Sequence, residues 1–69
     1  AIIEVAVPED WQGRSIGELD IRRKYGVNIL GVKRYGKTDV NISPETVLDA
    51  DMTLLVLGEN QELKKHFRL

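Results

Sequence analysis

A short basic segment carries the side chains best suited to ligand chemistry. Arg22 begins the basic run 22–24, and Asn28 follows a few residues later. A guanidinium offers paired donors that fit a phosphate, and an amide can bond the same anion or the edge of a base. Val27 and Ile29 flank Asn28 and could form apolar walls for a purine ring. These residue types therefore suit an anionic ligand that carries a flat ring.

The same segment also has a purely structural interpretation. Cations are favourable at the C-terminus of a helix, where the last carbonyl groups carry partial negative charge. Glu18 and Arg22 lie one helical turn apart, and such a pair contributes only a few tenths of a kcal/mol. Spacing alone does not select between the two interpretations.

The other polar residues do not form a recognisable catalytic or metal centre. His66 is the only histidine and stands beside Lys64 and Lys65, which is typical of a surface histidine near a helix end. Asp49 and Asp51 lack the glycine and the final glutamate of a calcium-binding loop, so a turn is favoured there. No GxGxxG or GxxxxGK[ST] phosphate loop occurs. We expect no enzymatic activity, no metal and no cofactor.

The elements that position the basic segment can be predicted from local patterns. Residues 2–7 are rich in β-branched side chains and predict a strand. A helix is predicted at 15–25, because Ser15 and Glu18 form a capping-box pattern and Gly26 suits a left-handed C-terminal cap. The basic run thus ends this helix.

The rest of the chain alternates apolar and turn-forming stretches. The predicted elements are a strand at 27–34, a hairpin turn at Gly36, a second arm at 38–42, a turn at 43–46, a strand at 52–57 and a short basic helix at 60–67. The strand at 27–34 is apolar on both faces, which indicates a central or interfacial strand, and the strand at 52–57 is predicted to be buried on both faces. The order predicts an α+β domain built on a small, mostly antiparallel sheet with two helices.

Composition limits what the chain can do alone. Its 69 residues contain no cysteine, so neither a disulfide nor a thiolate zinc site supplements a small core, and the surplus apolar faces favour a two-fold dimer. A net charge of -1 offers no strong attraction for nucleic acid or anionic lipid. The longest apolar run, 54–57, is far too short to cross a bilayer, so we expect a cytosolic module. The first residue is not Met, which suggests an excised fragment.

Two long segments resemble one known family. The stretch WQGRSIGELDIRRKYGVN at 11–28 and the stretch NISPETVLDADMTLLVLG at 41–58 are similar, in order and spacing, to the RCK C-terminal domain, also called the TrkA C-terminal domain. The match covers essentially residues 1–69. Within that family the sequence is most similar to the gating subunits of the Ktr type. These subunits form cytosolic rings on a potassium-transporting membrane subunit.

The resemblance implies a regulatory lobe that forms a homodimer within a larger ring. It also implies an N-terminal Rossmann-like half, which binds adenine nucleotides or NAD and is absent from this sequence. The membrane potassium-transporting subunit would be a partner through the parent protein. The expected location is cytoplasmic, at the inner face of the cell membrane through the transporter.

The resemblance further implies a ligand. In several Ktr-type subunits this lobe binds cyclic di-AMP at the dimer interface, and binding lowers potassium uptake. The residues that match the family's site are Arg22 and Asn28 for the phosphates and polar edges, Ile16, Val27 and Ile29 for the apolar walls, and Pro44 for the contact with an adenine. A purely structural dimerisation lobe of another channel or transporter, with no small-molecule ligand, is the alternative.

Overall fold

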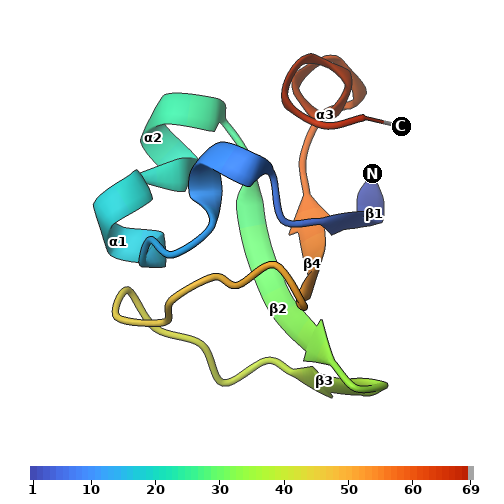
Figure 1. Cartoon of the computed structure of the whole chain (residues 1–69). Coiled ribbons are helices and arrows are strands. Elements are labelled where there is room, and N and C mark those ends of the chain that lie inside the picture. Colours follow the sequence, from blue (N-terminus) through green and yellow to red (C-terminus); the bar gives the residue numbers. More distant parts are fainter. Residues whose placement is uncertain (69) are drawn as a thin grey trace.

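The protein is built on one four-stranded antiparallel sheet (Figure 1). The computed structural model describes residues 1–68. Its strands are β1 (Ile2–Ala6), β2 (Asn28–Arg34), β3 (Lys37–Asp39) and β4 (Thr53–Leu57). Their order in the sheet is β1-β4-β2-β3, and every neighbouring pair is antiparallel. The predicted α+β class is therefore confirmed, and β2 is central as expected.

The helical segment before β2 differs from the prediction of one continuous helix at 15–25. It forms two short helices, α1 (Ile16–Leu19) and α2 (Ile21–Tyr25). Asp20 separates them because its backbone is left-handed, with φ 50° and ψ 50°. The break turns the second helix, so that Leu19 and Ile21 both enter the core although a straight helix would point them apart.

The ends of this segment follow the prediction. The Ser15 hydroxyl accepts a hydrogen bond from the backbone N–H of Glu18, and the Glu18 carboxylate accepts one from the backbone N–H of Ser15, which completes the capping box. Gly26 adopts φ 69° and ends α2. The chain therefore enters β2 through a fixed turn.

The hairpin between β2 and β3 turns at Tyr35 and Gly36, both with positive φ. The arm predicted at 38–42 is shorter, because β3 ends at Asp39. The Asp39 carboxylate accepts a hydrogen bond of 2.9 Å from the backbone N–H of Asn41, and this bond turns the chain away from the sheet. Because β3 pairs only with Val32–Arg34, the first residues of β2 have no strand on that side. This free edge faces α1 and α2.

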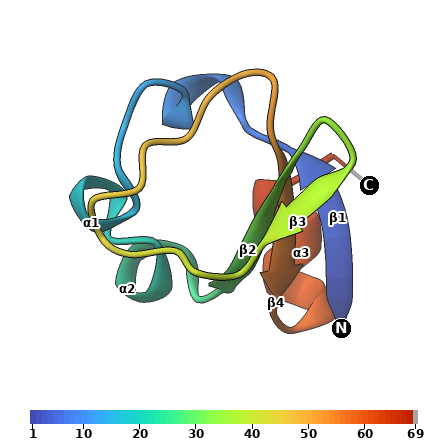
Figure 2. The same cartoon turned by 90° about the horizontal axis from the view of Figure 1, so that it is seen from below.

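A long loop joins β3 to β4 and closes the molecule. Its predicted turn at 43–46 is present, with the backbone N–H of Thr46 bonded to the Ser43 carbonyl at 3.0 Å. The loop then runs antiparallel to residues 13–17, as the Ser15–Val47 bridge shows, and passes beside α1 in Figure 2. It therefore lies against the start of α1 and the residues that precede it.

The core lies on one face of the sheet. The side chains of Leu54 and Val56 on β4 are fully buried there, under the 3-10 helix η1 (Glu9–Trp11) and the other helices. Trp11 is 1% exposed at the centre of this layer. The opposite face is different: Leu57 is 38% exposed. The prediction that residues 52–57 are buried on both faces is therefore wrong for the single chain, because the described elements cover only one face.

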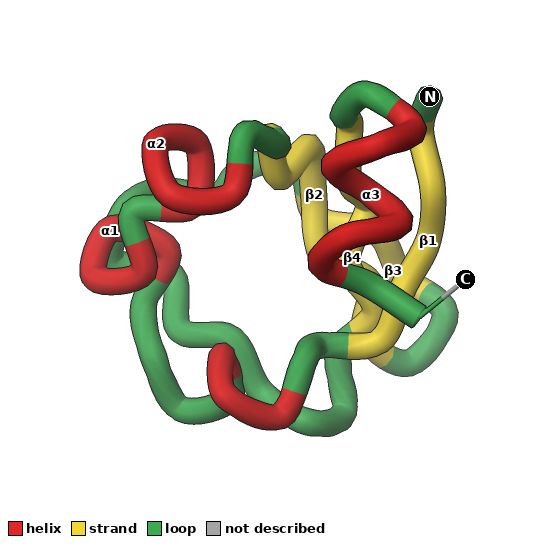
Figure 3. The backbone as a smooth tube through the Cα atoms, turned by 90° about the horizontal axis from the view of Figure 1, so that it is seen from above, coloured by secondary structure: helices red, strands yellow, loops and turns green. Residues whose placement is uncertain are grey.

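The last helix, α3 (Asn60–His66), caps one end of the sheet (Figure 3). His66 was predicted to be a surface residue, but its side chain is only 18% exposed. Its ring stands edge-on against Tyr25, with centroids 4.9 Å apart, and its Nε2 lies 3.3 Å from Glu62. His66 is therefore a packing residue. Within residues 1–68, no helix has the length and apolar character needed to cross a bilayer.

Candidate functional site

A shallow depression lies between the α1–α2 segment and the free edge of β2. Its volume is about 260 Å³. Five of the six predicted site residues line it, namely Ile16, Arg22, Val27, Asn28 and Ile29. They come from α1, from the start of α2 and from the start of β2 with the residue before it. The tertiary structure thus brings them together on one surface.

Pro44, the sixth predicted residue, lies at the margin of the depression. Its carbonyl oxygen accepts a hydrogen bond of 2.8 Å from the backbone N–H of Gly17, and Gly17 lines the depression. A Cβ placed on Gly17 would lie only 3.0 Å from the Pro44 Cβ. The absence of a side chain at Gly17 therefore allows the loop to approach this closely.

The two arginines of α2 have different surroundings. The Arg23 Nε lies 2.8 Å from the Asp20 carboxylate, so this guanidinium is already paired. The predicted pair between Glu18 and Arg22 is not formed, because the Glu18 carboxylate bonds to the Ser15 backbone. Among the described residues, Arg22 contacts no carboxylate within ion-pair distance, and it is exposed at the depression. Arg22 is thus the cation available to a phosphate.

The apolar walls also differ from one another. Val27 is completely buried, in contact with the core, so it supports the floor of the depression from beneath. Ile16 and Ile29 are partly buried and remain accessible from the depression. A flat apolar ring would therefore meet Ile16 and Ile29 directly.

Sequence reasoning missed three lining residues, Gly17, Asp20 and Ile21. Asp20 adopts a left-handed backbone, which Asp tolerates better than most residues. The Leu-Asp-Ile sequence 19–21 gives no clear signal of this break, because all three residues fit a helix. Gly17 could have been noticed as a glycine inside a helical pattern, where it often marks close packing.

A larger depression of about 570 Å³ lies elsewhere, between β1, η1 and the end of α3. Glu9, Asp10, His66 and Arg68 line it. Among the described residues, Glu9 and Asp10 contact no cation within ion-pair distance, so this surface disfavours an anion, whereas the Asp20 carboxylate of the smaller depression is paired with Arg23. None of the predicted site residues lies there, and chemistry favours the smaller depression beside Arg22.

The geometry of the sheet and helices defines the chain as a small α+β domain. The chain matches the model of the TrkA-C domain over residues 1–69 and belongs to that family, which confirms the resemblance to RCK C-terminal domains.

Known proteins support this membership. The chain is 28% identical to the Ktr system potassium uptake protein A of Bacillus subtilis over 65 residues, which are 94% of this chain and 29% of that protein. It is 32% identical over 54 residues to the K(+)/H(+) antiporter subunit KhtT of the same organism, covering 77% of this chain and 33% of that protein. The chain thus spans about a third of the length of these relatives.

A solved structure is also similar. It is the RCK C domain of the potassium transport protein KtrA in complex with cyclic di-AMP. The two chains share 32% identity and a TM-score of 0.84, over 94% of this chain and 76% of the other.

Proposed function

We propose that this domain regulates potassium transport by binding cyclic di-AMP between two copies of the chain. The observation that carries the proposal is the convergence of Ile16, Arg22, Asn28 and Ile29 on one depression, with Pro44 at its margin. The complex of a similar KtrA domain with this nucleotide supports the choice of ligand. The similarity to the Ktr system potassium uptake protein A of Bacillus subtilis supports a role in potassium transport.

The size of the depression supports a shared site. Pockets for drug-sized ligands usually have volumes of roughly 300–1,000 Å³. The depression of one chain, about 260 Å³, is below that range. Cyclic di-AMP has two equivalent halves, so a two-fold axis through the ligand gives each half the same contacts. Two copies of Arg22 can then face the two phosphates, and one ligand binds per dimer.

Regulation by this site needs no chemical reaction. A ligand that contacts both chains stabilises the dimer arrangement to which it binds more tightly, and it shifts the equilibrium by that difference in affinity. The domain would act within a larger protein that forms a ring on a membrane potassium-transporting subunit, at the cytoplasmic face. In this proposal binding lowers potassium uptake. The domain itself neither inserts into the membrane nor binds nucleic acid, and it is not an enzyme.

A structural role is the second candidate. The antiporter subunit among the relatives indicates that chains of this kind also occur outside potassium uptake systems. In that case the domain would hold two subunits together without a small-molecule ligand.

Titration calorimetry of the chain with cyclic di-AMP tests the proposal. We expect saturable binding with about one nucleotide for two chains, and no comparable heat with AMP at the same concentration as the control. If a chain shown to be folded and dimeric releases no heat at high micromolar nucleotide, the structural role is correct. One nucleotide for each chain would contradict the shared site.

A further inference from the structure

The two edges of the sheet differ in how they are protected against pairing with another chain. β3, at one edge, has three residues, all exposed, and two of them are the charged Lys37 and Asp39. A short and charged edge strand resists the addition of another strand. β1, at the other edge, has five residues in an unbroken register with β4 and contains neither a proline nor a bulge. Its edge therefore has the length and regularity that a further strand requires.

The backbone of β1 presents unpaired groups along this edge. Ala1 and Gly58 exchange two hydrogen bonds, of 2.7 and 3.0 Å, in the register that β1 and β4 continue. Because bonded and non-bonded pairs alternate along antiparallel strands, every second residue of β1 points its N–H and C=O groups away from β4. These outward residues are Ile2, Glu4 and Ala6. Within residues 1–68 no hydrogen bond is formed to their outward groups, so these groups are available to another chain.

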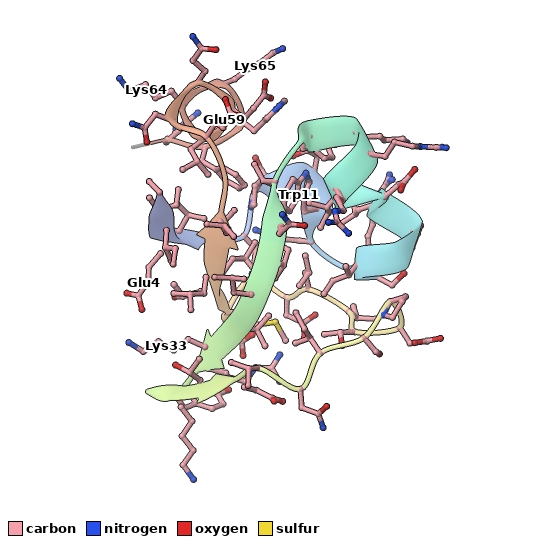
Figure 4. All side chains as sticks on the ribbon, turned by 180° about the vertical axis from the view of Figure 1, so that it is seen from behind. Glu4, Trp11, Lys33, Glu59, Lys64 and Lys65 are labelled. Carbon is pink, nitrogen blue, oxygen red and sulfur yellow. The ribbon has the colours of Figure 1, made fainter. Side chains whose placement is uncertain are left out.

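The one charged side chain of β1 does not cover this edge. The Glu4 carboxylate lies 3.8 Å from the Nζ of Lys33 on β2, on the other side of β4. Figure 4 shows both side chains on the side of the sheet away from Trp11. Side chains of a strand stand roughly perpendicular to the sheet, so Glu4 lies over the open face and leaves the backbone edge free.

A depression of about 570 Å³ opens where this edge ends. Val5 and Ala6 of β1 border it, and η1 and the residues after α3 complete its walls. The buried walls, Val5, Val7 and Phe67, are apolar. The volume lies within the range of roughly 300–1,000 Å³ that is usual for ligand pockets. A side chain from a strand added beside Val5 would therefore have a space to enter.

The charged rim of this depression favours a basic side chain. Glu9 and Asp10 are exposed, and neither carboxylate contacts a cation within ion-pair distance among the described residues. The rim also holds Arg68, and His66, whose Nε2 lies 3.3 Å from Glu62. Two free carboxylates thus stand against one guanidinium. A lysine or arginine suits this arrangement, because its aliphatic stem can lie on apolar walls while its charge meets the carboxylates.

We propose that the β1 edge binds an extended segment of a partner protein that carries a lysine or an arginine. The segment adds a strand beside β1 through hydrogen bonds to the outward backbone groups, and its basic side chain enters the depression towards Glu9 and Asp10. In such strand addition the backbone bonds supply affinity and the side-chain pocket supplies specificity. The edge is separate from the depression beside Arg22, since β4 lies between β1 and β2, which borders that depression. The proposal therefore does not depend on cyclic di-AMP.

NMR titration of the chain with a blocked peptide, acetyl-Ser-Val-Thr-Lys-Thr-Val-Ser-amide, tests this proposal. The peptide favours an extended conformation and sets its Lys between two Val on one face. We expect binding at about 1 mM peptide or below, with slower hydrogen exchange at the outward amides of β1 and shifted resonances at Glu9 and Asp10. The same peptide with Glu in place of Lys should bind at least tenfold more weakly.

The Ala6→Pro variant tests the backbone contact. The N–H of Ala6 points away from β4, so proline removes an outward donor and keeps the bonds between β1 and β4. We expect at least a tenfold loss of peptide affinity, with an unchanged response to cyclic di-AMP. Ala6→Val keeps the N–H and is the matched control, which should change peptide affinity less than threefold.

The double variant Glu9→Gln and Asp10→Asn tests the charged rim. It should remove the preference for the Lys peptide over the Glu peptide, because neither side chain then carries a charge. Glu45→Gln on the loop between β3 and β4 removes one carboxylate far from β1 in the sequence and should leave the preference unchanged.

Several results would overturn the proposal. They are no perturbation of the folded chain at about 1 mM Lys peptide, perturbations confined to the depression beside Arg22, and equal peptide affinity in Ala6→Pro and Ala6→Val. If sedimentation shows that Ala6→Pro weakens self-association, the edge pairs with a second copy and the partner segment is wrong. A chain that binds the peptide as expected but not cyclic di-AMP would contradict only the proposed function.

Discussion

Gly17 and Pro44 are joined by a backbone hydrogen bond of 2.8 Å between the first turn of α1 and the loop before β4. The two residues lie 27 positions apart in the sequence. Their contact fixes the loop against the α1–α2 segment and sets Pro44 at the margin of the candidate site. The shape of that site therefore depends on one position that has no side chain.

Substitution of Gly17→Ala should push the loop away from α1. The new methyl group would lie 3.0 Å from the Pro44 Cβ and its carbonyl oxygen. Overpacking costs about 1–3 kcal/mol, whereas Ala is favoured over Gly within a helix by roughly 0.5–1 kcal/mol. We expect a net loss of about 1 kcal/mol in the free energy of unfolding, measured by urea at fixed protein concentration, and weaker binding of cyclic di-AMP. An unchanged free energy of unfolding would mean that the loop moves aside at little cost. Glu45→Ala on the same loop is the control.

Replacing the two arginines of α2 separately should have unequal effects. Arg22→Ala removes the cation that faces the depression, and a charge-assisted hydrogen bond contributes about 1.5–3 kcal/mol. We expect at least a tenfold loss of cyclic di-AMP affinity in calorimetry. Arg23→Ala removes the same charge from a side chain paired with Asp20, and should change affinity less than threefold. Equal losses in the two variants would indicate a general effect of charge and not a contact at Arg22.

The Asn28→Asp variant tests the polar edge of the site. The two side chains have nearly the same size, so packing should be preserved, but the carboxylate would repel a phosphate and remove the amide donor. We expect binding of cyclic di-AMP to fall at least tenfold, with a free energy of unfolding within about 0.5 kcal/mol of the unchanged chain. Retained affinity would remove Asn28 from the site.

The Tyr35→Asn variant should stabilise the protein. Tyr35 has φ 53° in a two-residue hairpin turn, a position that favours Asn or Gly, and it is 85% exposed. Its hydroxyl makes one exposed hydrogen bond of 3.2 Å to Asp51, which offsets part of the gain. We expect an increase of roughly 0.5 kcal/mol in the free energy of unfolding. A decrease would show that the bond to Asp51 outweighs the backbone strain.

The hairpin has a second anchor that should remain in that variant. The Arg34 guanidinium lies 2.6 Å from Asp49 and 3.2 Å from Asp51. Partial burial lowers the pKa of Arg34, but its hydrogen bonds and charge contacts with the two carboxylates outweigh this and raise the pKa above its ordinary value. Arg34 therefore stays protonated across the pH range of these experiments.

Much of the fold could be predicted from local patterns. The strands, the capping box at Ser15, the Gly26 cap and the Gly36 hairpin depend on residues close in sequence, so these features and the α+β class agree with the structure, although the second hairpin arm ends early, at Asp39. The break at Asp20 could not be predicted in this way. It serves to bring Leu19 and Ile21 into one core, and that requirement arises only when the sheet is present.

The candidate site could also be predicted only in part from the sequence. The sequence by itself determined the family and the residue types at the site, because these are carried by segments of continuous chain. Only the tertiary structure decided that Arg22 is available while Arg23 is paired, and that Val27 lies in the core beneath Ile16 and Ile29. It also decided which sheet face is left open. Each of these depends on contacts between residues distant in sequence or on a backbone break, which spacing along the chain does not encode.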